Sequence, residues 1–212
     1  MPLSKSDRAQ IVLKTLKKLY PKLEKFLNTS TDYEFLFAVI LSAQTTDKKV
    51  NEVTPLLFKK YPTLIDYVKA DKDQFTSSIK QIGLYKSKAK HILSTAKILQ
   101  EKYNGKIPST MEELLELPGV GRKTANVVLG YIHGIVEGIA VDTHVIRLSQ
   151  KYGLTTHTEA KKIEKDLMQI LPKDEWFQFT NRMIAYGREY CPAKSHDHLQ
   201  CPLALALKSP ND

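Results

Sequence analysis

The amino-acid sequence predicts an all-α fold, and three features of the chain support this prediction. Apolar residues recur at the three- and four-residue spacing of one helix face, most clearly in Lys86–Tyr103. Prolines, glycines and hydroxyl side chains mark where helices begin and end. No segment alternates apolar and polar residues in the way that a half-buried strand does. From these segments we expect roughly nine or ten helices of ordinary length.

The expected helices can be placed in order along the chain. An amphipathic helix near the N-terminus carries Leu13, Leu16 and Leu19 on one face. Helix starts are expected at Ser109 and Thr156, each followed three residues later by a glutamate that would complete a capping box. Helix ends are expected at three prolines and two glycines, namely Pro62, Pro118, Pro172, Gly83 and Gly153.

The composition bounds both the size of the core and the kind of partner. With 212 residues, 42% of them hydrophobic, the chain can bury one sizeable core or two small ones. Lys and Arg outnumber Asp and Glu by 32 to 23, which gives a net charge of +9. A polyanionic partner explains this excess, because basic side chains release counterions from phosphates. A basic surface without a dedicated partner is the alternative.

The apolar segments are too short to cross a membrane. The longest runs, Phe35–Leu41 and Ile135–Val141, fall well below the roughly 20 apolar residues that a bilayer requires. Residues 1–5 lead straight into a charged segment without the apolar core of a secretory signal. We therefore expect a soluble, intracellular protein with no membrane partner.

The most informative stretch is Leu117–Ala125, which reads LPGVGRKTA. We expect one helix to stop at Pro118 and a second to begin near Gly121. Gly119 and Gly121 permit a tight turn and the close approach of a partner to the main chain. The N–H groups at the start of the second helix favour an anion such as a phosphate.

Two other glycine-rich motifs do not fit this stretch. A dinucleotide-binding fingerprint needs glycine where Thr124 stands, and it needs a preceding strand. A P-loop needs glycine where Arg122 stands. A helix–hairpin–helix that holds a phosphodiester backbone remains, with an ordinary helical corner as the alternative.

Lys123 stands where a lysine can act as a nucleophile. In the first turn of a helix, the positive end of the helix dipole and the neighbouring Arg122 both disfavour the charged ammonium. A neutral amine can attack an electrophilic carbon. Taken alone, a solvated surface lysine is the more common outcome for a residue of this type.

Asp142 and His144 belong to a second polar segment, VDTHVIR. Asp142 stands where an apolar segment gives way to a helix, so we expect it to cap the helix N-terminus. A carboxylate in this position can also act as a base or stabilise a developing cation. His144 can contact DNA or fill a structural role, and from the sequence the structural role is favoured.

Taken together, these segments resemble the endonuclease III family of helix–hairpin–helix DNA glycosylases. LPGVGRKTANVVL at 117–129 and AVDTHVIR at 140–147 match the two most characteristic segments of that family. LSAQTTD at 41–47, IGLYKSKA at 82–89 and YGR at 186–188 resemble further family segments in the same order. The resemblance covers residues 10–191, most of the chain.

The resemblance implies a bifunctional DNA glycosylase and AP lyase of base excision repair. Its substrate is double-stranded DNA with damaged bases, usually oxidised pyrimidines, or with abasic sites. In the family the hairpin lysine, here Lys123, attacks the sugar C1′ of a flipped-out nucleotide, and the aspartate, here Asp142, assists the nucleophile and stabilises charge on the sugar. A Schiff base and β-elimination then cut the strand. Flipping is needed because the glycosidic bond cannot be reached in a stacked duplex.

The resemblance also implies an architecture and a set of DNA contacts. A six-helix barrel with the hairpin is expected at 25–135, and a second domain at 1–24 with 136–212, with DNA and the active site in the groove between them. Gln44 and Leu84 are expected to enter the duplex and fill the gap left by the extruded base. Further DNA contacts are expected at Gly119, Val120, Gly121, Arg122, Thr124 and His144. We expect a monomer in the cytoplasm of a prokaryotic cell, associated with the nucleoid.

The sequence departs from the family at its C-terminal metal site. Most members bind an iron–sulfur cluster through four cysteines spaced C-x6-C-x2-C-x5-C, and starting at Cys191 this requires cysteines at 198, 201 and 207. The chain has His198, Cys201 and Leu207 at these positions. Because a cubane cluster needs four ligands, normally thiolates, we expect no cluster and no other cofactor.

A metal-free loop is the favoured interpretation of this C-terminal segment, with packing supplied by the alternating leucines Leu203, Leu205 and Leu207. A less favoured alternative is a zinc ion bound by Cys191, His196, His198 and Cys201. The close spacing of the two histidines and the absence of a C-x2-C pair count against it. A disulfide between the two cysteines is not expected in a reducing cell.

Two other functions compete with the bifunctional enzyme. A monofunctional glycosylase of the same superfold, such as an adenine-mismatch enzyme, would lack the hairpin lysine and need a further domain for which 212 residues leave no room. A non-catalytic hairpin module that only binds DNA would explain the charge and the glycines. It would not explain the presence of both Lys123 and Asp142.

Overall fold

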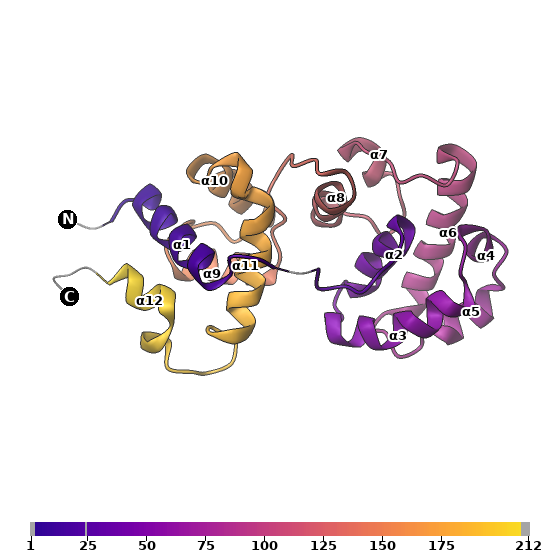
Figure 1. Ribbon diagram of the computed structural model, residues 1–212, viewed down its shortest axis with the longest axis horizontal. Coiled ribbons are helices and arrows are strands. Elements are labelled where there is room, and N and C mark those ends of the chain that lie inside the picture. Colours follow the sequence, from indigo (N-terminus) through magenta and orange to yellow (C-terminus); the bar gives the residue numbers. More distant parts are fainter. Residues whose placement is uncertain (1–2, 24, 209–212) are drawn as a thin grey trace. The chain divides into compact units, whose positions relative to one another are not determined.

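Helices make up all the regular structure in residues 3–23 and 25–208, the part of the chain that the computed structural model describes. These residues contain no strand, so the predicted all-α fold is confirmed. The chain divides into two compact units (Figure 1). Unit 1 comprises residues 1–24 and 136–212, and unit 2 comprises residues 25–135.

Unit 2 is built around two helices, a largely buried one of 11 residues and an amphipathic one of 19 residues. Its elements are α2 (Asp32–Ser42), α3 (Asp47–Lys60), α4 (Leu64–Val68), α5 (Lys72–Ser78), α6 (Tyr85–Tyr103), α7 (Met111–Leu115), α8 (Arg122–Val128) and the π-helical turn η1 (Leu129–His133). Residues 35–41 of α2 are all buried, so this helix runs through the interior. Helix α6 packs against α2, α4 and α5.

The predicted inner face of α6 is confirmed. Its buried apolar residues are Ala89, Ile92, Leu93, Ala96 and Leu99. Beyond them, Tyr67 of α4 has no exposed surface, and its ring centroid lies 4.8–5.9 Å from those of Phe37, Tyr61 and Phe75. Tilted aromatic contacts at this range add to the energy of area burial, which helps a five-residue helix to hold its place.

Unit 1 combines the first helix of the chain with the last. Its elements are α1 (Lys5–Leu19), α9 (Thr143–Lys151), α10 (Ala160–Ile170), η2 (Lys173–Glu175), α11 (Trp176–Glu189), η3 (His198–Gln200) and α12 (Pro202–Leu207). Helix α1 packs against α10, α11 and α12. Its Val12 and Leu16 share a core with Phe179 and Leu203, so segments from both ends of the sequence stabilise one another.

A buried carboxylate also joins α1 to α11. Glu175, only 8% exposed, accepts hydrogen bonds from Nζ of Lys17 and, at 2.6 Å, from Nη1 of Arg182. Arg182 in turn donates from Nε to the carbonyl of Tyr20 at 3.2 Å. Burial alone would raise the pKa of Glu175, but the hydrogen bonds from Lys17 and Arg182 outweigh it and hold the pKa below its usual value.

Two predicted capping boxes are wrong: the neighbouring hydroxyl caps one helix, and the other helix starts later than expected. Thr110, not Ser109, caps α7, and its Oγ1 accepts from the N–H of Glu113 at 3.3 Å. No box forms at Thr156. There Thr155 accepts from the N–H of His157 in a local turn, and α10 starts later, at Ala160.

The number of helices and the packing of the C-terminal leucines also differ from expectation. Twelve α-helices form in the described residues, because segments as short as α4 and α7 are stabilised by tertiary burial. The leucines after Cys201 lie on a helix, α12, so Leu203 and Leu207 share a face and Leu205 lies on another. Leu203 is fully buried, Leu207 is partly buried and Leu205 is 53% exposed, so the expected packing is wrong for Leu205.

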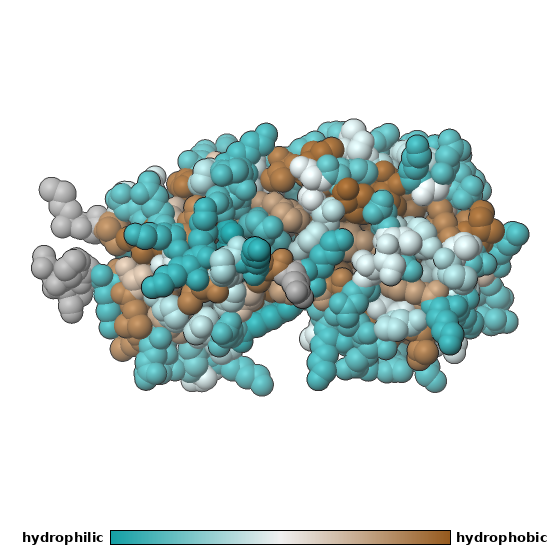
Figure 2. Space-filling model, viewed as in Figure 1, coloured by the Kyte–Doolittle hydropathy of each residue, from teal (hydrophilic) through white to brown (hydrophobic). Residues whose placement is uncertain are grey.

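The visible surface is mostly hydrophilic, with smaller apolar patches on both units (Figure 2). None of the helices in the described part of the chain combines the length and the apolar character needed to cross a bilayer.

Replacing Glu175 with Gln should lower the free energy of unfolding by about 3 kcal/mol at neutral pH, because two cations lose their buried counterion. The folded pKa is depressed, so this stabilisation is present above the ordinary carboxyl pKa of 4.5 and is lost as pH falls through the folded value. Chemical denaturation of wild type and variant at neutral and acid pH measures the difference. Glu159→Gln, which breaks the exposed pair with Lys162, is the control and should cost less than about 0.5 kcal/mol. Equal losses in the two variants would contradict the assigned role of Glu175.

Candidate active site

The hairpin between α7 and α8 turns at Gly119 and rests on α6. The φ angle of Gly119 is +81°, in the left-handed region that disfavours a side chain. A Cβ at this position would lie 2.8 Å from Nδ1 of His91. Oγ1 of the buried Thr95 donates to the carbonyl of Pro118 at 3.1 Å. Conformation and packing therefore both require glycine at 119.

Gly121 is open to a partner for a different reason. Its φ of −101° suits any residue, and a Cβ here would meet no atom within 4 Å. It is the N-cap residue of α8, and as a glycine it brings no side chain of its own to the first turn. Gly121 is exposed, so a partner can approach the main chain at the positive end of the helix, as anion binding requires.

The other hairpin residues occupy different environments. Lys123 and Thr124 lie in the first turn of α8 and are half-buried, and Arg122 is exposed. Val120 is only 8% exposed, and its N–H donates to the carbonyl of Leu117 at 3.1 Å. Val120 therefore anchors the turn from inside unit 2, whereas its neighbours at 121 and 122 face outward.

Gln44 and Leu84 share an uncommon backbone conformation. With Asn104 they are the non-glycine residues of positive φ in the described chain, at 53° for Gln44 and 57° for Leu84. Leu84 is also 59% exposed, although it is large and apolar. A left-handed leucine held out to solvent is costly on both counts, and such positions are most often retained for function.

The loops that carry these two residues lie next to each other. A Cβ on Gly83 would contact the carbonyl oxygen of Gln44 at 3.4 Å. From α6, Nζ of Lys88 donates to the carbonyl of Leu41 at 2.8 Å and to Oγ1 of Thr45 at 2.9 Å. Lys88 is only 4% exposed, and this burial lowers its pKa to about 8. Lys88 thus fixes the Gln44 loop against the helix that begins at Leu84.

Lys88 was missed by the sequence analysis, although a signal existed. It lies four residues before Ile92 on the buried face of α6, where a lysine is not expected without a polar partner. A lysine on the apolar stripe of a predicted helix is evidence for a buried hydrogen-bonding role, even when the acceptors are unknown.

In unit 1, Asp142 caps α9 as predicted. Its Oδ1 accepts from the N–H of Val145 at 2.9 Å, and the bond leaves Oδ2 for another partner. His144 lies in the first turn of α9 against the buried Gly187 of α11, where a Cβ would stand 2.5 Å from Nδ1 of His144. The ring fills the space that glycine leaves, which favours the structural role for His144.

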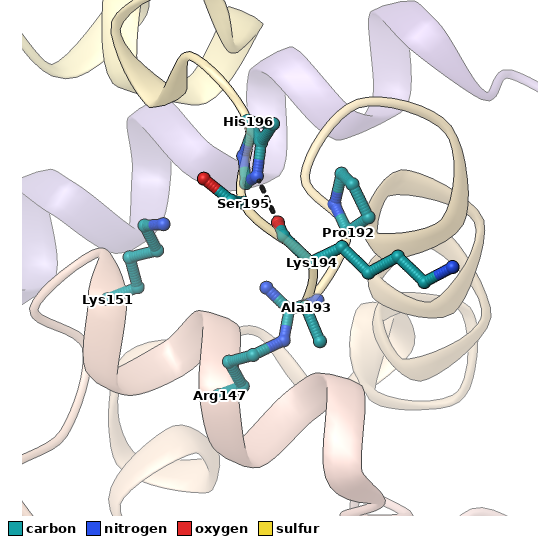
Figure 3. A pocket seen from close by; sticks show the side chains of 7 residues that line it. All are labelled: Arg147, Lys151, Pro192, Ala193, Lys194, Ser195 and His196. Atoms are coloured by element: carbon teal, nitrogen blue, oxygen red, sulfur yellow. Dashed lines mark hydrogen bonds between the residues drawn. The ribbon is translucent and has the colours of Figure 1, made fainter.

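The C-terminal loop of unit 1 gathers four potential metal ligands. Cys191, His196, His198 and Cys201 each offer one ligand atom, and all four atoms lie within 4.8 Å of one another. Both cysteines are free and buried. His196 also lines a cavity of about 240 Å³, together with the basic residues Arg147, Lys151 and Lys194 (Figure 3). The sequence predicted the four residues but favoured a loop without metal.

Known proteins resemble this chain over most of its length. Residues 37–173 match the model of the HhH-GPD superfamily base excision DNA repair proteins. The chain is 45% identical to the Endonuclease III of Synechocystis sp., covering 95% of this chain and 92% of the relative. It is 42% identical to that of Bacillus subtilis, covering 92% and 89%. A solved structure of an endonuclease III trapped as a covalent intermediate with DNA has 42% identity and a TM-score of 0.90, covering 96% and 95%.

The helical fold, the glycine hairpin and these similarities define a helix–hairpin–helix enzyme of base excision repair that acts on DNA. Within that class, the chain belongs to the endonuclease III family of the HhH-GPD superfamily.

Substituting alanine at the two hairpin glycines should have opposite effects. Gly119→Ala should lower the free energy of unfolding by about 2 kcal/mol, because the left-handed backbone is strained and the methyl group meets His91. Gly121→Ala should leave stability within about 0.5 kcal/mol but weaken binding to duplex DNA, because the methyl group hinders the approach of a phosphate to the main chain. Thermal denaturation and fluorescence anisotropy measure the two quantities. A destabilised Gly121→Ala protein with intact DNA affinity would reverse the two assignments.

The difference in stability between the wild-type protein and Lys88→Met should change with pH in the alkaline range. The pKa of Lys88 is about 8 in the folded protein and 10.5 when unperturbed, so between these values the unfolded state holds more protons. Wild-type stability should therefore rise relative to Lys88→Met over this window, and urea denaturation at several pH values measures it. The exposed Lys90→Met is the matched control and should show no such trend. A flat difference for Lys88→Met would show that the ammonium is not desolvated.

Proposed function

We propose that this protein is a bifunctional DNA glycosylase and AP lyase, with Lys123 as the nucleophile and Asp142 as its acidic partner. The observation that carries the proposal is a half-buried lysine in the first turn of α8, two residues after the exposed N-cap residue Gly121. An endonuclease III with 42% identity to this chain has been captured in covalent linkage to DNA, which supports an amine nucleophile here.

The proposed reaction begins with the neutral amine of Lys123. Its Nζ attacks C1′ of the flipped nucleotide, the bond from C1′ to the base breaks, and the base leaves with a proton. The sugar ring opens to a Schiff base between C1′ and Nζ. A proton is then lost from C2′, and the bond between C3′ and its phosphate oxygen breaks, which cuts the strand 3′ to the lesion. Water releases the enzyme by hydrolysing the Schiff base.

Asp142 is assigned two tasks in this scheme. One carboxylate oxygen caps α9, which fixes the orientation of the side chain. The other is proposed to accept the proton of the attacking amine and to stabilise the positive charge that develops on the sugar. A side chain held by its own helix needs little reorganisation during the reaction, and this is the condition under which electrostatic stabilisation is most effective.

Gln44 and Leu84 are assigned to the distorted duplex. We propose that Leu84 enters the base stack as an apolar wedge and that the amide of Gln44 bonds to the base left without a partner. The exposure of Leu84 and the left-handed backbone of both residues support this role. The outward-facing hairpin residues, Gly119, Gly121, Arg122 and Thr124, are assigned to the phosphate backbone, and the charge of +9 to general attraction for DNA.

We infer that unit 2 acts as the hairpin-bearing domain and unit 1 as the domain formed by both chain ends. No step of the scheme is assigned to a cofactor, and a cubane cluster would need two more thiolates than this chain contains.

Oxidised pyrimidines are the proposed lesions, and the nucleoid of a prokaryotic cell is the proposed place of action. A panel of duplexes, each with one lesion and scored separately for base release and strand cleavage, tests the lesion assignment.

Replacing Lys123 with Ala should reduce strand cleavage by about a thousandfold or more and abolish borohydride trapping on an abasic duplex. DNA affinity should change little, because backbone groups contact the phosphates. Asp142→Asn should reduce base release by about a hundredfold or more at unchanged thermal stability, because asparagine still caps α9. Lys97→Ala, at an exposed position on α6, is the matched control. Covalent trapping by Lys123→Ala at the wild-type rate would assign the nucleophile elsewhere.

A further inference from the structure

The four side chains gathered at the end of unit 1 come from two helix ends and the loop between them. Cys191 follows α11, and its N–H donates to the carbonyl of Tyr186 at 3.1 Å. Cys201 is the residue before α12, and its N–H donates to the carbonyl of His198 at 3.0 Å. Both cysteines are thus held by backbone hydrogen bonds, and the loop folds back to bring His196 and His198 between them.

The two histidines offer different ring nitrogens. Nδ1 of His196 lies 2.9 Å from the carbonyl of Lys194, so Nδ1 carries the proton and Nε2 carries the lone pair (Figure 3). Nε2 of His196 is buried and has no hydrogen-bond partner within the described structure. Nδ1 of His198 lies 3.7 Å from Sγ of Cys191. Histidines only two positions apart can therefore converge, which removes the objection that their spacing is cramped.

The unpartnered Nε2 of His196 is the observation that points to a ligand. A buried ring nitrogen without a partner is costly, and native structures nearly always satisfy such an atom. The bond from Nδ1 to a backbone carbonyl is also the usual outer contact of a metal-binding histidine, since it fixes the tautomer and the direction of the lone pair.

The residues present do not fit the iron–sulfur cluster of the family. A four-iron cluster binds one thiolate on each iron, and this site has two thiols and ligand atoms no more than 4.8 Å apart. A two-iron cluster with two histidines and two cysteines places the nitrogens on one iron and the sulfurs on the other, so nitrogen and sulfur ligands are separated by the cluster. Here a nitrogen and a sulfur lie 3.7 Å apart.

The separation between a sulfur and a nitrogen of the set fits a single tetrahedral ion. Bonds of about 2.3 Å to sulfur and about 2.05 Å to nitrogen at a tetrahedral angle put sulfur and nitrogen about 3.6 Å apart. The separation between Cys191 Sγ and His198 Nδ1 is 3.7 Å. Two sulfurs and two imidazoles in tetrahedral order are a set that zinc prefers among the common divalent ions.

We propose that this protein binds one structural zinc ion through Cys191 Sγ, His196 Nε2, His198 Nδ1 and Cys201 Sγ, at the position where its relatives hold a cluster. Binding forms four bonds to zinc and releases two thiol protons to solvent. As a thiol, Sγ of Cys201 donates to the carbonyl of Tyr190 at 3.0 Å. That hydrogen bond is lost when the thiol ionises, and the sulfur turns to the ion.

Neighbouring residues already support such a site. Arg147 donates from Nη2 to the carbonyl of Cys191 at 2.7 Å, and its Nη1 lies 3.8 Å from the sulfur. The ring of His198 packs against Tyr152 with centroids 5.6 Å apart. The N–H of Leu203 donates to the hydroxyl of Tyr186 at 3.0 Å. The ion would therefore tie the end of α11 to the start of α12, which places Leu203 in the core of unit 1.

Metal analysis of the full-length protein, purified under anaerobic conditions, tests the proposal without reference to DNA cleavage. We expect one equivalent of zinc, no stoichiometric iron and no visible absorption. Replacing zinc with cobalt should give the visible bands of tetrahedral cobalt together with thiolate charge-transfer absorption. His196→Ala and Cys201→Ser should lower the zinc content by about tenfold or more and reduce the thermal midpoint, as should a chelator on the wild type. His157→Ala, at a half-exposed histidine of unit 1, is the matched control.

Three results would overturn the proposal. Stoichiometric iron with visible absorption would show that a cluster forms despite the missing thiolates. Wild-type protein with no metal and either two free thiols or a Cys191–Cys201 disulfide would show an unused cluster of side chains. Full zinc content in both His196→Ala and Cys201→Ser would place the ion elsewhere. If those variants fail to fold, X-ray absorption at the zinc edge of the wild type decides, since two sulfur and two nitrogen neighbours are required.

Discussion

One face of α6 supports every proposed DNA contact in unit 2. Lys88, His91 and Thr95 follow one another at the spacing of a single helical stripe, directly after Leu84 at the helix start. Lys88 fixes the loop of Gln44, His91 fills the space beside Gly119, and Thr95 holds the carbonyl of Pro118. A rotation of this one helix would displace the wedge, the loop and the hairpin together. Function on this unit therefore depends on the rigidity of α6, which its buried contacts with α2, α4 and α5 provide.

In unit 1 the corresponding constraint is the close approach of α9 and α11. Gly187 lets the two helices meet with the ring of His144 against the backbone of α11. Arg147, one turn further along α9, reaches the carbonyl of Cys191 just beyond the end of α11. The contacts that position α9, the helix that Asp142 caps, thus also hold Cys191, the first ligand of the proposed zinc site. The acidic residue and the C-terminal loop share one support, although their tasks are unrelated.

Local sequence signals predicted much of this structure, and their failures have identifiable causes. The all-α fold, the stripe of α6 and the cap at Asp142 depend on spacing and on single residue types, which a sequence displays directly. The capping residue of α7 was wrong because the adjacent hydroxyl of Thr110 acts as the cap, and that of α10 was wrong because the helix starts later, with Glu159 as its N-cap residue. Lys88 was missed because its acceptors, Leu41 and Thr45, lie more than forty positions away. Convergence of His196 and His198 depends on which ring nitrogen each presents, and the sequence contains no signal for that choice.

The left-handed backbone at Gln44 and Leu84 also matters for anyone who wishes to improve this protein. Each residue raises the energy of the folded state by about 1 kcal/mol or more, so glycine or asparagine at either position relieves strain without disturbing the core. A library screened only for heat resistance would therefore enrich substitutions at these two positions early. Such variants would be more thermostable but would have lost the side chains proposed to enter the duplex. At these two positions stability favours residues that damage recognition does not, so Gln44 and Leu84 should be left unchanged in any thermostabilised version.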